Sequence, residues 1–269
     1  MDDIYTMSSF FTNRSAEAIH KISIEYLSID LDEVTINSIV DLKHYRKSPN
    51  LGAKATDRIL QLVTPKGQIY FKFGLTDNEM CAELLAYHLA NSLDIKVAKT
   101  ALAWYKDAIG IASWSIGEYS KPDNSKSYNV LDFLHFEGFV EMCLFDYLIM
   151  NVDRHAGNWC IQNNSVAPLF DHDYSFGGDE PPIDSDSDSF MVGLTSPFEY
   201  RLQQDKILAL LYKLDADKVE KFLSLVNELS DTDMFVLSEL YPKQYRAIKK
   251  LFQARIIYMS RRVGELRGR

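Results

Sequence analysis

The chain has 269 residues, of which 46% are hydrophobic and 25% charged, with a net charge of −9. This composition is typical of a globular protein with a sizeable core, and its acidic balance argues against recruitment by nucleic acid or by an anionic membrane. Cys81, Cys143 and Cys160 form no C-x-x-C pair, which excludes a disulfide framework or structural zinc site of the usual spacing. The first residues lack the apolar core of a signal peptide, so we expect a cytoplasmic protein, with a signal-independent secretion route left open.

The first part of the chain is rich in predicted strands. Apolar and polar residues alternate over 56–64 and again over 68–74, with the turn residues Pro-Lys-Gly at 65–67 between them. This pattern predicts a β-hairpin. Two more strands are predicted over 99–116, around a Tyr-Lys-Asp turn.

Helices are predicted between and after these strands. A helix is expected over 76–93, because Thr76 followed by Glu79 fits a capping box and leucines recur at helical spacing. Beyond a polar loop at 117–129 the chain becomes mainly helical. We therefore predict an α+β fold with two parts. Residues 1–116 form a small sheet with one helix, and residues 117–269 form a mostly helical part.

The stretch from 151 to 173 carries the most informative side chains. "NWCI" and "VAPLF" can form two short strands joined by "QNNS". Because a hairpin brings its ends together, we expect Asn158 and Asp171 to be neighbours in space. Their oxygen atoms are hard ligands that suit Mg²⁺. Asp153, five residues before Asn158, is placed to point at a reacting hydroxyl, so the layout suits phosphoryl transfer.

The motifs "DRHAGN" and "LFDHD" together resemble those of the HipA-like and phosphatidylinositol 3-/4-kinase-like families, which share an atypical kinase fold. The resemblance implies a two-lobed, protein-kinase-like fold and an ATP- and Mg²⁺-dependent serine/threonine protein kinase of a compact bacterial type. It implies Asp153 as base or hydroxyl-orienting residue and Asn158 and Asp171 as metal ligands. His155 is either the base, as argued for lipid-kinase relatives, or a stabiliser of the transferred phosphate or of the loop.

An ATP site also needs a lysine on a strand that is held by a glutamate on a helix. Lys72 interrupts the apolar strand "IYFKFG", and Glu83 lies among apolar residues of the following helix. We predict that these two residues pair at the ATP phosphates. Glu79 is the rival partner, although its capping-box position gives it another role.

Two further segments are candidate contacts for ATP. The loop at 46–60 lies where a phosphate-covering loop belongs, and Ser48 and Gly52 are its candidate binding residues. The adenine contacts are expected from the backbone of Ser113, Trp114 and Ser115, after the last strand of the first part.

Several alternatives remain open from the sequence. The acceptor is a protein with Ser or Thr, or else a lipid headgroup or small molecule, and a nucleotide-binding pseudokinase within a toxin–antitoxin pair is a third reading. The expected partners are therefore a protein substrate and a cognate regulator or antitoxin, without direct nucleic-acid binding or membrane insertion. A metal-dependent hydrolase is a competing class of enzyme, and it would use His155, Asp171, His172 and Asp173. Two serine-bearing loops are candidates for self-phosphorylation. Ser48 is favoured as an inhibitory site over Ser185, Ser187 and Ser189, because its new charge would pair with Arg46 and Lys47.

Overall fold

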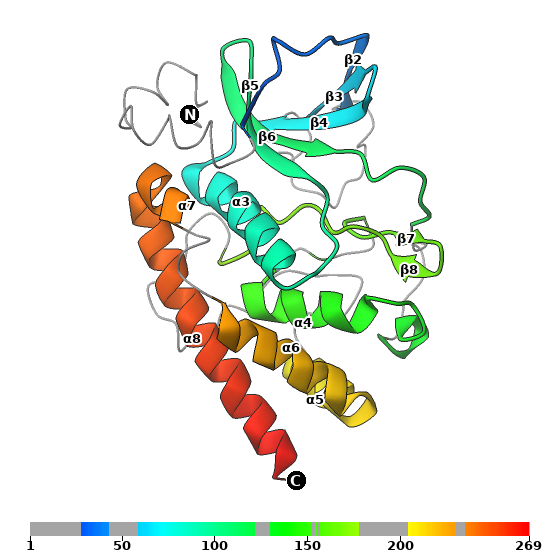
Figure 1. Cartoon of the computed structure of the whole chain (residues 1–269), viewed down its shortest axis with the longest axis vertical. Coiled ribbons are helices and arrows are strands. Elements are labelled where there is room, and N and C mark those ends of the chain that lie inside the picture. Colours follow the sequence, from blue (N-terminus) through cyan, green and yellow to red (C-terminus); the bar gives the residue numbers. More distant parts are fainter. Residues whose placement is uncertain are drawn as a thin grey trace, which may run out of the picture.

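Figure 1 shows the computed structural model, which describes residues 28–42, 59–121, 130–151, 154, 157–177, 204–229 and 235–268. A β-sheet lies at one end of the molecule and a group of helices at the other, with α3 between them (Figure 1). The larger sheet contains β1 (Ser28–Asp30), β2 (Ser38–Asp41), β3 (Ile59–Thr64), β4 (Gly67–Phe73), β5 (Thr100–Tyr105) and β6 (Ala108–Trp114). The helices are α3 (Asp77–Ser92), α4 (Phe139–Ile149), α5 (Gln204–Leu214), α6 (Ala216–Glu228), α7 (Phe235–Leu240) and α8 (Pro242–Arg267), with a 3₁₀ turn at Val130–Phe133. This arrangement confirms the predicted α+β class.

The predicted hairpin is formed by β3 and β4, which pair antiparallel with Thr64 opposite Gly67. The connection is Pro65 and Lys66, one residue shorter than the predicted turn. Gly67 has a φ of 125°, a region that side chains rarely adopt, and its carbonyl accepts a hydrogen bond of 2.8 Å from the Thr64 hydroxyl. These features fix the register that places Lys72 opposite Ile59.

The sheet has the strand order β1-β5-β6-β4-β3-β2. β5 and β6 confirm the two strands expected over 99–116, whereas β1 and β2 were missed in the sequence. β1 lies parallel to β5, and such a pairing leaves no local turn signal. β4 is paired on both sides, with β3 and with β6, so Lys72 lies on an interior strand.

Both faces of the sheet are covered at β5, which is why all six of its residues are buried. Leu102 and Trp104 belong to a core shared with α3, whereas Ala103 and Tyr105 belong to a second, smaller core. Successive side chains of a strand point to opposite faces, so the alternation follows from the pleat. The smaller core also contains Leu31, which is fully buried.

The helix α3 begins as its sequence predicts. The Thr76 backbone N–H donates to Glu79 Oε2 at 2.5 Å, and the Glu79 N–H donates to Thr76 Oγ1 at 3.2 Å. This reciprocal capping box fixes the first turn of the helix. Because the start is fixed, the helix presents Glu83 one turn later, on the side that faces β4.

The helical part of the molecule is built around α4, which is buried at all of its positions except Glu141. It packs against α5, α6 and α8, and α8 extends along the side of the molecule and also contacts α3 (Figure 1). One hydrophobic core therefore includes residues of α3 and of the C-terminal helices. The division of the chain into domains at residues 116 and 117 stays a prediction. Within the described ranges, no helix has the length and apolarity that a membrane crossing needs.

Candidate active site

The hairpin predicted inside the stretch 151–173 is present in a shorter form. β7 (Ile161–Gln162) and β8 (Ser165–Val166) pair antiparallel, joined by Asn163 and Asn164. These two asparagines have φ values of 51° and 61°, as a type I′ turn requires, and asparagine tolerates that region better than most residues. The hairpin reverses the chain between Asn158 and Asp171.

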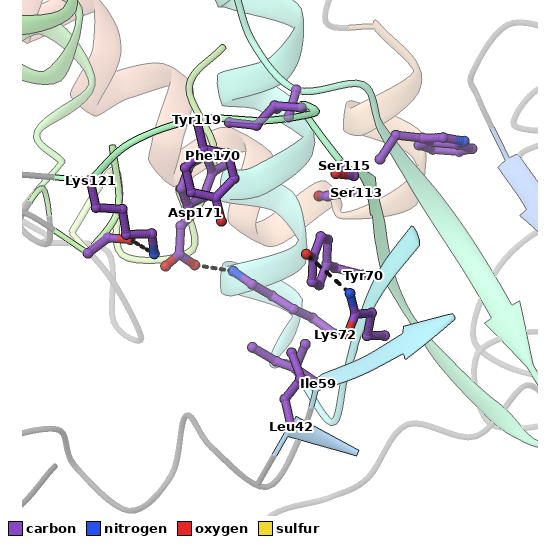
Figure 2. Close-up of a pocket in the computed structure, with 15 residues that line it drawn as sticks. Leu42, Ile59, Tyr70, Lys72, Ser113, Ser115, Tyr119, Lys121, Phe170 and Asp171 are labelled. Atoms are coloured by element: carbon purple, nitrogen blue, oxygen red, sulfur yellow. Dashed lines mark hydrogen bonds and ion pairs between the residues drawn. The ribbon is translucent and has the colours of Figure 1, made fainter. Parts of the chain in front are cut away.

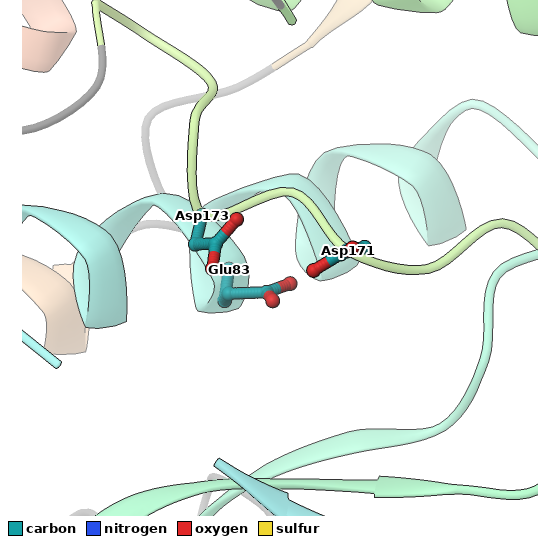
Figure 3. Close-up of side chains that lie close together, drawn as sticks. All are labelled: Glu83, Asp171 and Asp173. Atoms are coloured by element: carbon teal, nitrogen blue, oxygen red, sulfur yellow. The ribbon is translucent and has the colours of Figure 1, made fainter. Parts of the chain in front are cut away.

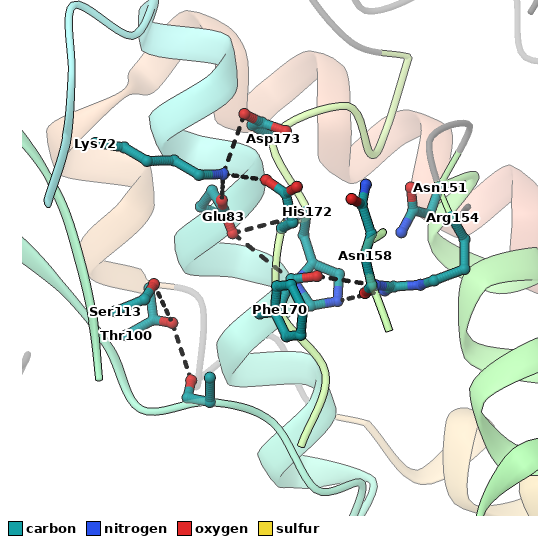
Figure 4. Close-up of polar contacts among 12 residues, drawn as sticks. Lys72, Glu83, Thr100, Ser113, Asn151, Arg154, Asn158, Phe170, His172 and Asp173 are labelled. Carbon is teal, nitrogen blue, oxygen red and sulfur yellow. Dashed lines mark hydrogen bonds and ion pairs between the residues drawn. The ribbon is translucent and has the colours of Figure 1, made fainter. Parts of the chain in front are cut away.

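Lys72 is the centre of the candidate site. Its Nζ atom lies 2.7 Å from Glu83 Oε1 and 3.2 Å from Asp173 Oδ2, and it also forms an ion pair with Asp171 (Figure 4). An ammonium group has three N–H donors, so three carboxylates use its full capacity. Burial by itself lowers the pKa of Lys72, but Asp171, Asp173 and Glu83 outweigh it and hold the pKa well above its usual range. Lys72 is therefore charged at physiological pH.

Glu83 is the helical partner of Lys72 in the structure, as predicted, and it also reaches a second segment. Its Oε2 atom accepts a hydrogen bond of 3.0 Å from the backbone N–H of His172. Glu83 thus connects the strand β4 with the loop that carries Asp171. The rival residue Glu79 is occupied by the capping box at the start of α3.

Three carboxylates gather around this lysine. One oxygen each from Glu83, Asp171 and Asp173 lies within 4.8 Å of the others (Figure 3). Burial is the main reason that the pKa of Asp173 is raised to about 8, with Asp171 and Glu83 adding to the rise and Lys72 opposing it. The structure therefore gathers three carboxyl groups at the position where a cation is expected.

His172 lies between the two aspartates and is 2% exposed. Its Nε2 atom is 2.9 Å from Nη2 of Arg154, and because arginine can only donate, Nε2 accepts and the ring proton is on Nδ1. Burial and then the Arg154 guanidinium hold the pKa of His172 well below its usual range, so the ring is neutral. The nitrogen that a metal-dependent hydrolase would use is thus occupied, which disfavours that class of enzyme.

A cavity of 590 Å³ lies beside Lys72, between the sheet and the loop at Phe170 and Asp171 (Figure 2). Its volume is in the range of small-molecule and cofactor sites. The cavity lining is mixed. It comprises Leu42, Ile59, Gln61, Tyr70, Lys72, Ala98, Ser113, Trp114, Ser115, Ile116, Tyr119, Lys121, Gly157, Phe170 and Asp171. A lining that combines apolar side chains with Lys72, Lys121 and Asp171 suits a ligand that has a flat base and a phosphate chain.

The residues predicted to contact adenine line this cavity, but two of their backbone donors are engaged. The Trp114 N–H donates to the carbonyl of Lys99 at 3.0 Å, and the Ser115 N–H donates to the carbonyl of Gln68 at 2.9 Å. A base at this wall would meet the side chains and carbonyls of the segment, or the backbone after Ser115. The adenine role of Ser113, Trp114 and Ser115 stays a prediction.

Four of the predicted site residues, namely Asp153, His155, Ser48 and Gly52, lie outside the described residues. Sequence reasoning also missed residues that line or support the site. Lys121 donates to the carbonyl of Gly157 at 2.9 Å and lines the same cavity as Lys72, on the side of Asp171 (Figure 2). No pattern in the sequence points to Lys121. Arg154 belongs to the motif "DRHAGN", but the sequence alone indicates no role for it.

The donor set fits a divalent cation. Asp171, Asp173 and Glu83 offer three carboxyl oxygens close to one another, and the amide of Asn158 lies at the other end of the β7–β8 hairpin from Asp171. Oxygen ligands of this kind, combined with phosphate oxygens, are what Mg²⁺ prefers. Histidine and cysteine donors, which a zinc site would need, are absent from the carboxylate cluster of the described residues.

The fold and this geometry define a class of site. A strand lysine paired with a helical glutamate, together with an aspartate and an asparagine at the ends of a hairpin, is the arrangement of phosphoryl-transfer sites in kinases. No family model matches the chain. Among known proteins, the serine/threonine-protein kinase CtkA of Helicobacter pylori is 31% identical over 141 residues, which cover 40% of this chain and 43% of that protein. This distant relationship supports a kinase-like phosphotransferase.

The crystal structure of the Helicobacter pylori proinflammatory kinase CtkA is also similar to this chain. The alignment covers 86% of this chain and 99% of the CtkA chain, with 20% sequence identity and a TM-score of 0.43.

Proposed function

We propose that this chain is an ATP- and Mg²⁺-dependent protein kinase of the HipA-like type that phosphorylates Ser or Thr. The observation that carries the proposal is Lys72, which lines the cavity and contacts both Glu83 on α3 and Asp171 after the hairpin. The acceptor class is supported by the name of the relative, a serine/threonine-protein kinase.

Each residue has a separate task in this proposal. Lys72 neutralises the α- and β-phosphates, and Glu83 holds its ammonium group in place. Asn158 and Asp171 hold Mg²⁺, which supplies charge neutralisation at the phosphate oxygens when it is bound. Asp153 is the base or orients the acceptor hydroxyl, and His155 is either the base or a stabiliser of the transferred phosphate or of the loop.

The present contacts of Lys72 set a condition for nucleotide binding. All three of its donors are used by carboxylates, so at least one carboxylate must give way before a phosphate oxygen can bind. Asp171 and Asp173 are the ones expected to leave, because Glu83 is anchored by its second bond to the His172 N–H. The Lys72–Glu83 pair therefore persists in both states.

The proposal is tested with the full chain, labelled ATP and Mg²⁺. A generic protein substrate and phosphoinositide vesicles are offered side by side, which separates a protein kinase from a lipid kinase. We expect label on protein, and we expect Asp171→Ala to abolish it. Asp217→Asn, a change of an exposed carboxylate on α6, is the control and should label as the wild type does. Equal labelling by Asp171→Ala would remove the proposed metal role.

Mass spectrometry of the expressed protein provides an independent readout. Phosphate on the wild type and none on Asp153→Ala would establish transfer and show the preferred acceptor residue. ATP binding without any transfer would instead support the pseudokinase reading.

A further inference from the structure

Arg154 is a buried arginine whose donors are all used inside the protein. The side chain is 2% exposed. Nε donates to Asp146 Oδ2 at 2.9 Å, and Nη2 donates to Asp146 Oδ1 at 3.1 Å and to His172 Nε2 at 2.9 Å. Nη1 donates to two backbone carbonyls. A guanidinium group has five N–H donors, and these contacts match each of them with an acceptor.

The two carbonyls that Nη1 contacts belong to the two segments of the proposed metal site. One is the carbonyl of Asn158 itself, at 2.6 Å. The other is the carbonyl of Phe170, at 2.8 Å, directly before Asp171. A single nitrogen atom therefore ties together the backbones at both ends of the β7–β8 hairpin (Figure 4). The short hairpin has only two residues in each strand, so it needs such an additional tie to fix its open ends.

Asp171 has an unusual backbone conformation that these contacts support. Its φ is 67°, in the left-handed region that residues other than glycine seldom adopt, although aspartate enters it more readily than most. The peptide groups on its two sides are both held. Arg154 binds the carbonyl of Phe170, and Glu83 binds the N–H of His172 at 3.0 Å. The direction of the Asp171 carboxylate thus depends on a buried cation on one side and a buried anion on the other.

Asp146 fixes the guanidinium group from the opposite direction. It is fully buried on α4 and accepts from both Nε and Nη2 of Arg154, and also from Nδ2 of Asn151 at 3.1 Å. This fork leaves Nη1 pointing toward the two carbonyls. Lysine has the same charge but donates from one atom, so it cannot hold Asp146, the two carbonyls and His172 together.

We propose that Arg154 is a positioning residue that holds the backbones of Asn158 and Asp171 in the arrangement that binds the divalent cation, without contacting the cation or the nucleotide. This inference rests on the proposed function. It adds to that function the residue on which the geometry of the metal ligands depends.

The test compares Arg154→Lys with the wild type in the full chain. Mn²⁺ serves as the probe, and its dissociation constant is measured by electron paramagnetic resonance without nucleotide. We expect an increase of about tenfold or more in that constant, and a similar increase in the Mg²⁺ concentration needed for half-maximal turnover. The turnover at saturating Mg²⁺ should recover to within a few-fold of the wild type, because the chemical groups themselves are unchanged. Backbone hydrogen exchange over residues 167–177 should be faster.

Asn151→Ala is the matched control. Asn151 is also fully buried, and its Nδ2 atom donates to the same carboxylate, Asp146 Oδ1, at 3.1 Å. We expect this variant to lose stability while it keeps the wild-type affinity for Mn²⁺. If Arg154→Lys does not fold, the charge-neutral pair Asp146→Asn with Arg154→Gln replaces it, since this pair removes both buried charges together.

The outcomes separate the inference from the proposed function. Wild-type Mn²⁺ affinity and wild-type exchange in Arg154→Lys would overturn the inference, as would an equal loss of affinity in Asn151→Ala. A wild type that binds Mn²⁺ but transfers no phosphate would overturn the proposed function alone, and the affinity and exchange comparisons would still decide the role of Arg154.

Discussion

Lys72 on β4 and Glu83 on α3 form an ion pair of 2.7 Å in which the glutamate side chain is only 3% exposed. The pair joins the sheet to the helix, and the second carboxylate oxygen of Glu83 extends this connection to the backbone of His172. One glutamate therefore aligns the proposed phosphate-binding lysine with the proposed metal-binding loop.

We expect Glu83→Gln to lower phosphate transfer by about 100-fold, because the ammonium group of Lys72 loses its anchor and shifts toward Asp171 and Asp173. Steady-state kinetics with varied ATP measures the effect. Glu79→Gln is a control on the same helix, and it should keep both stability and activity because glutamine also satisfies a capping box. Equal kinetics in the two variants would contradict the anchoring role of Glu83.

The pKa of Asp173 predicts a pH dependence of stability. Burial raises this pKa to about 8 in the folded protein, above the value of roughly 4 that an unfolded chain shows. Between these values the folded state binds more protons than the unfolded state, so Asp173 makes stability fall as the pH rises from about 4 to about 8. In the Asp173→Asn variant this carboxyl group is replaced by an amide, which does not titrate, so this contribution to the pH dependence is removed. In urea unfolding at pH 5 and pH 8.5, the variant should lose less stability than the wild type, and parallel losses would show that Asp173 is not responsible.

Gly110 on β6 is predicted to tolerate no side chain. A Cβ atom at this position would lie 1.9 Å from the carbonyl oxygen of Lys72 on the neighbouring strand. Gly110→Ala must therefore displace β4, and we expect a loss of about 1–3 kcal/mol in the free energy of unfolding, together with weaker ATP binding. Gly264→Ala on α8 is the contrasting variant, since its Cβ meets nothing within 4 Å and a helical alanine gains up to about 1 kcal/mol. Calorimetry of both variants measures whether stability falls in Gly110→Ala and rises in Gly264→Ala. Unchanged stability in Gly110→Ala would refute the close contact.

The three cysteines are predicted to be unreactive in the folded protein. Cys81, Cys143 and Cys160 are all buried. Burial raises the pKa of Cys160 to about 11, although Lys121 and Arg154 oppose the rise. At pH 8 roughly one thousandth of such a thiol is the reactive thiolate. Titration with a thiol reagent should modify fewer than one cysteine per chain in the native protein and all three after denaturation. Rapid modification of Cys160 in the native state would show that the loop after Asn158 opens readily.

Local sequence patterns were sufficient to predict the strand, the helix and the hairpin that carry the site residues. Each of these elements is specified mainly by residues that are close together in the sequence. Alternation predicted the strand that carries Lys72, and the capping box at Thr76 predicted the helix that carries Glu83. The spacing across the Asn-rich turn predicted that Asn158 and Asp171 lie at the two ends of one hairpin. These features follow from short-range sterics and hydrogen bonding, which a few consecutive residues are sufficient to specify.

The tertiary structure alone decided how these elements meet. The contacts of Lys72 with Asp171 and Asp173 join positions about a hundred residues apart in the sequence. The parallel pairing of β1 with β5 has no connecting turn whose residues could be recognised in the sequence. The buried pair of Asp146 and Arg154 was equally invisible, because a charged residue in a sequence is expected at the surface unless its partner is known. Burial of a charge depends on the full set of groups that surround it, and only the folded chain brings that set together.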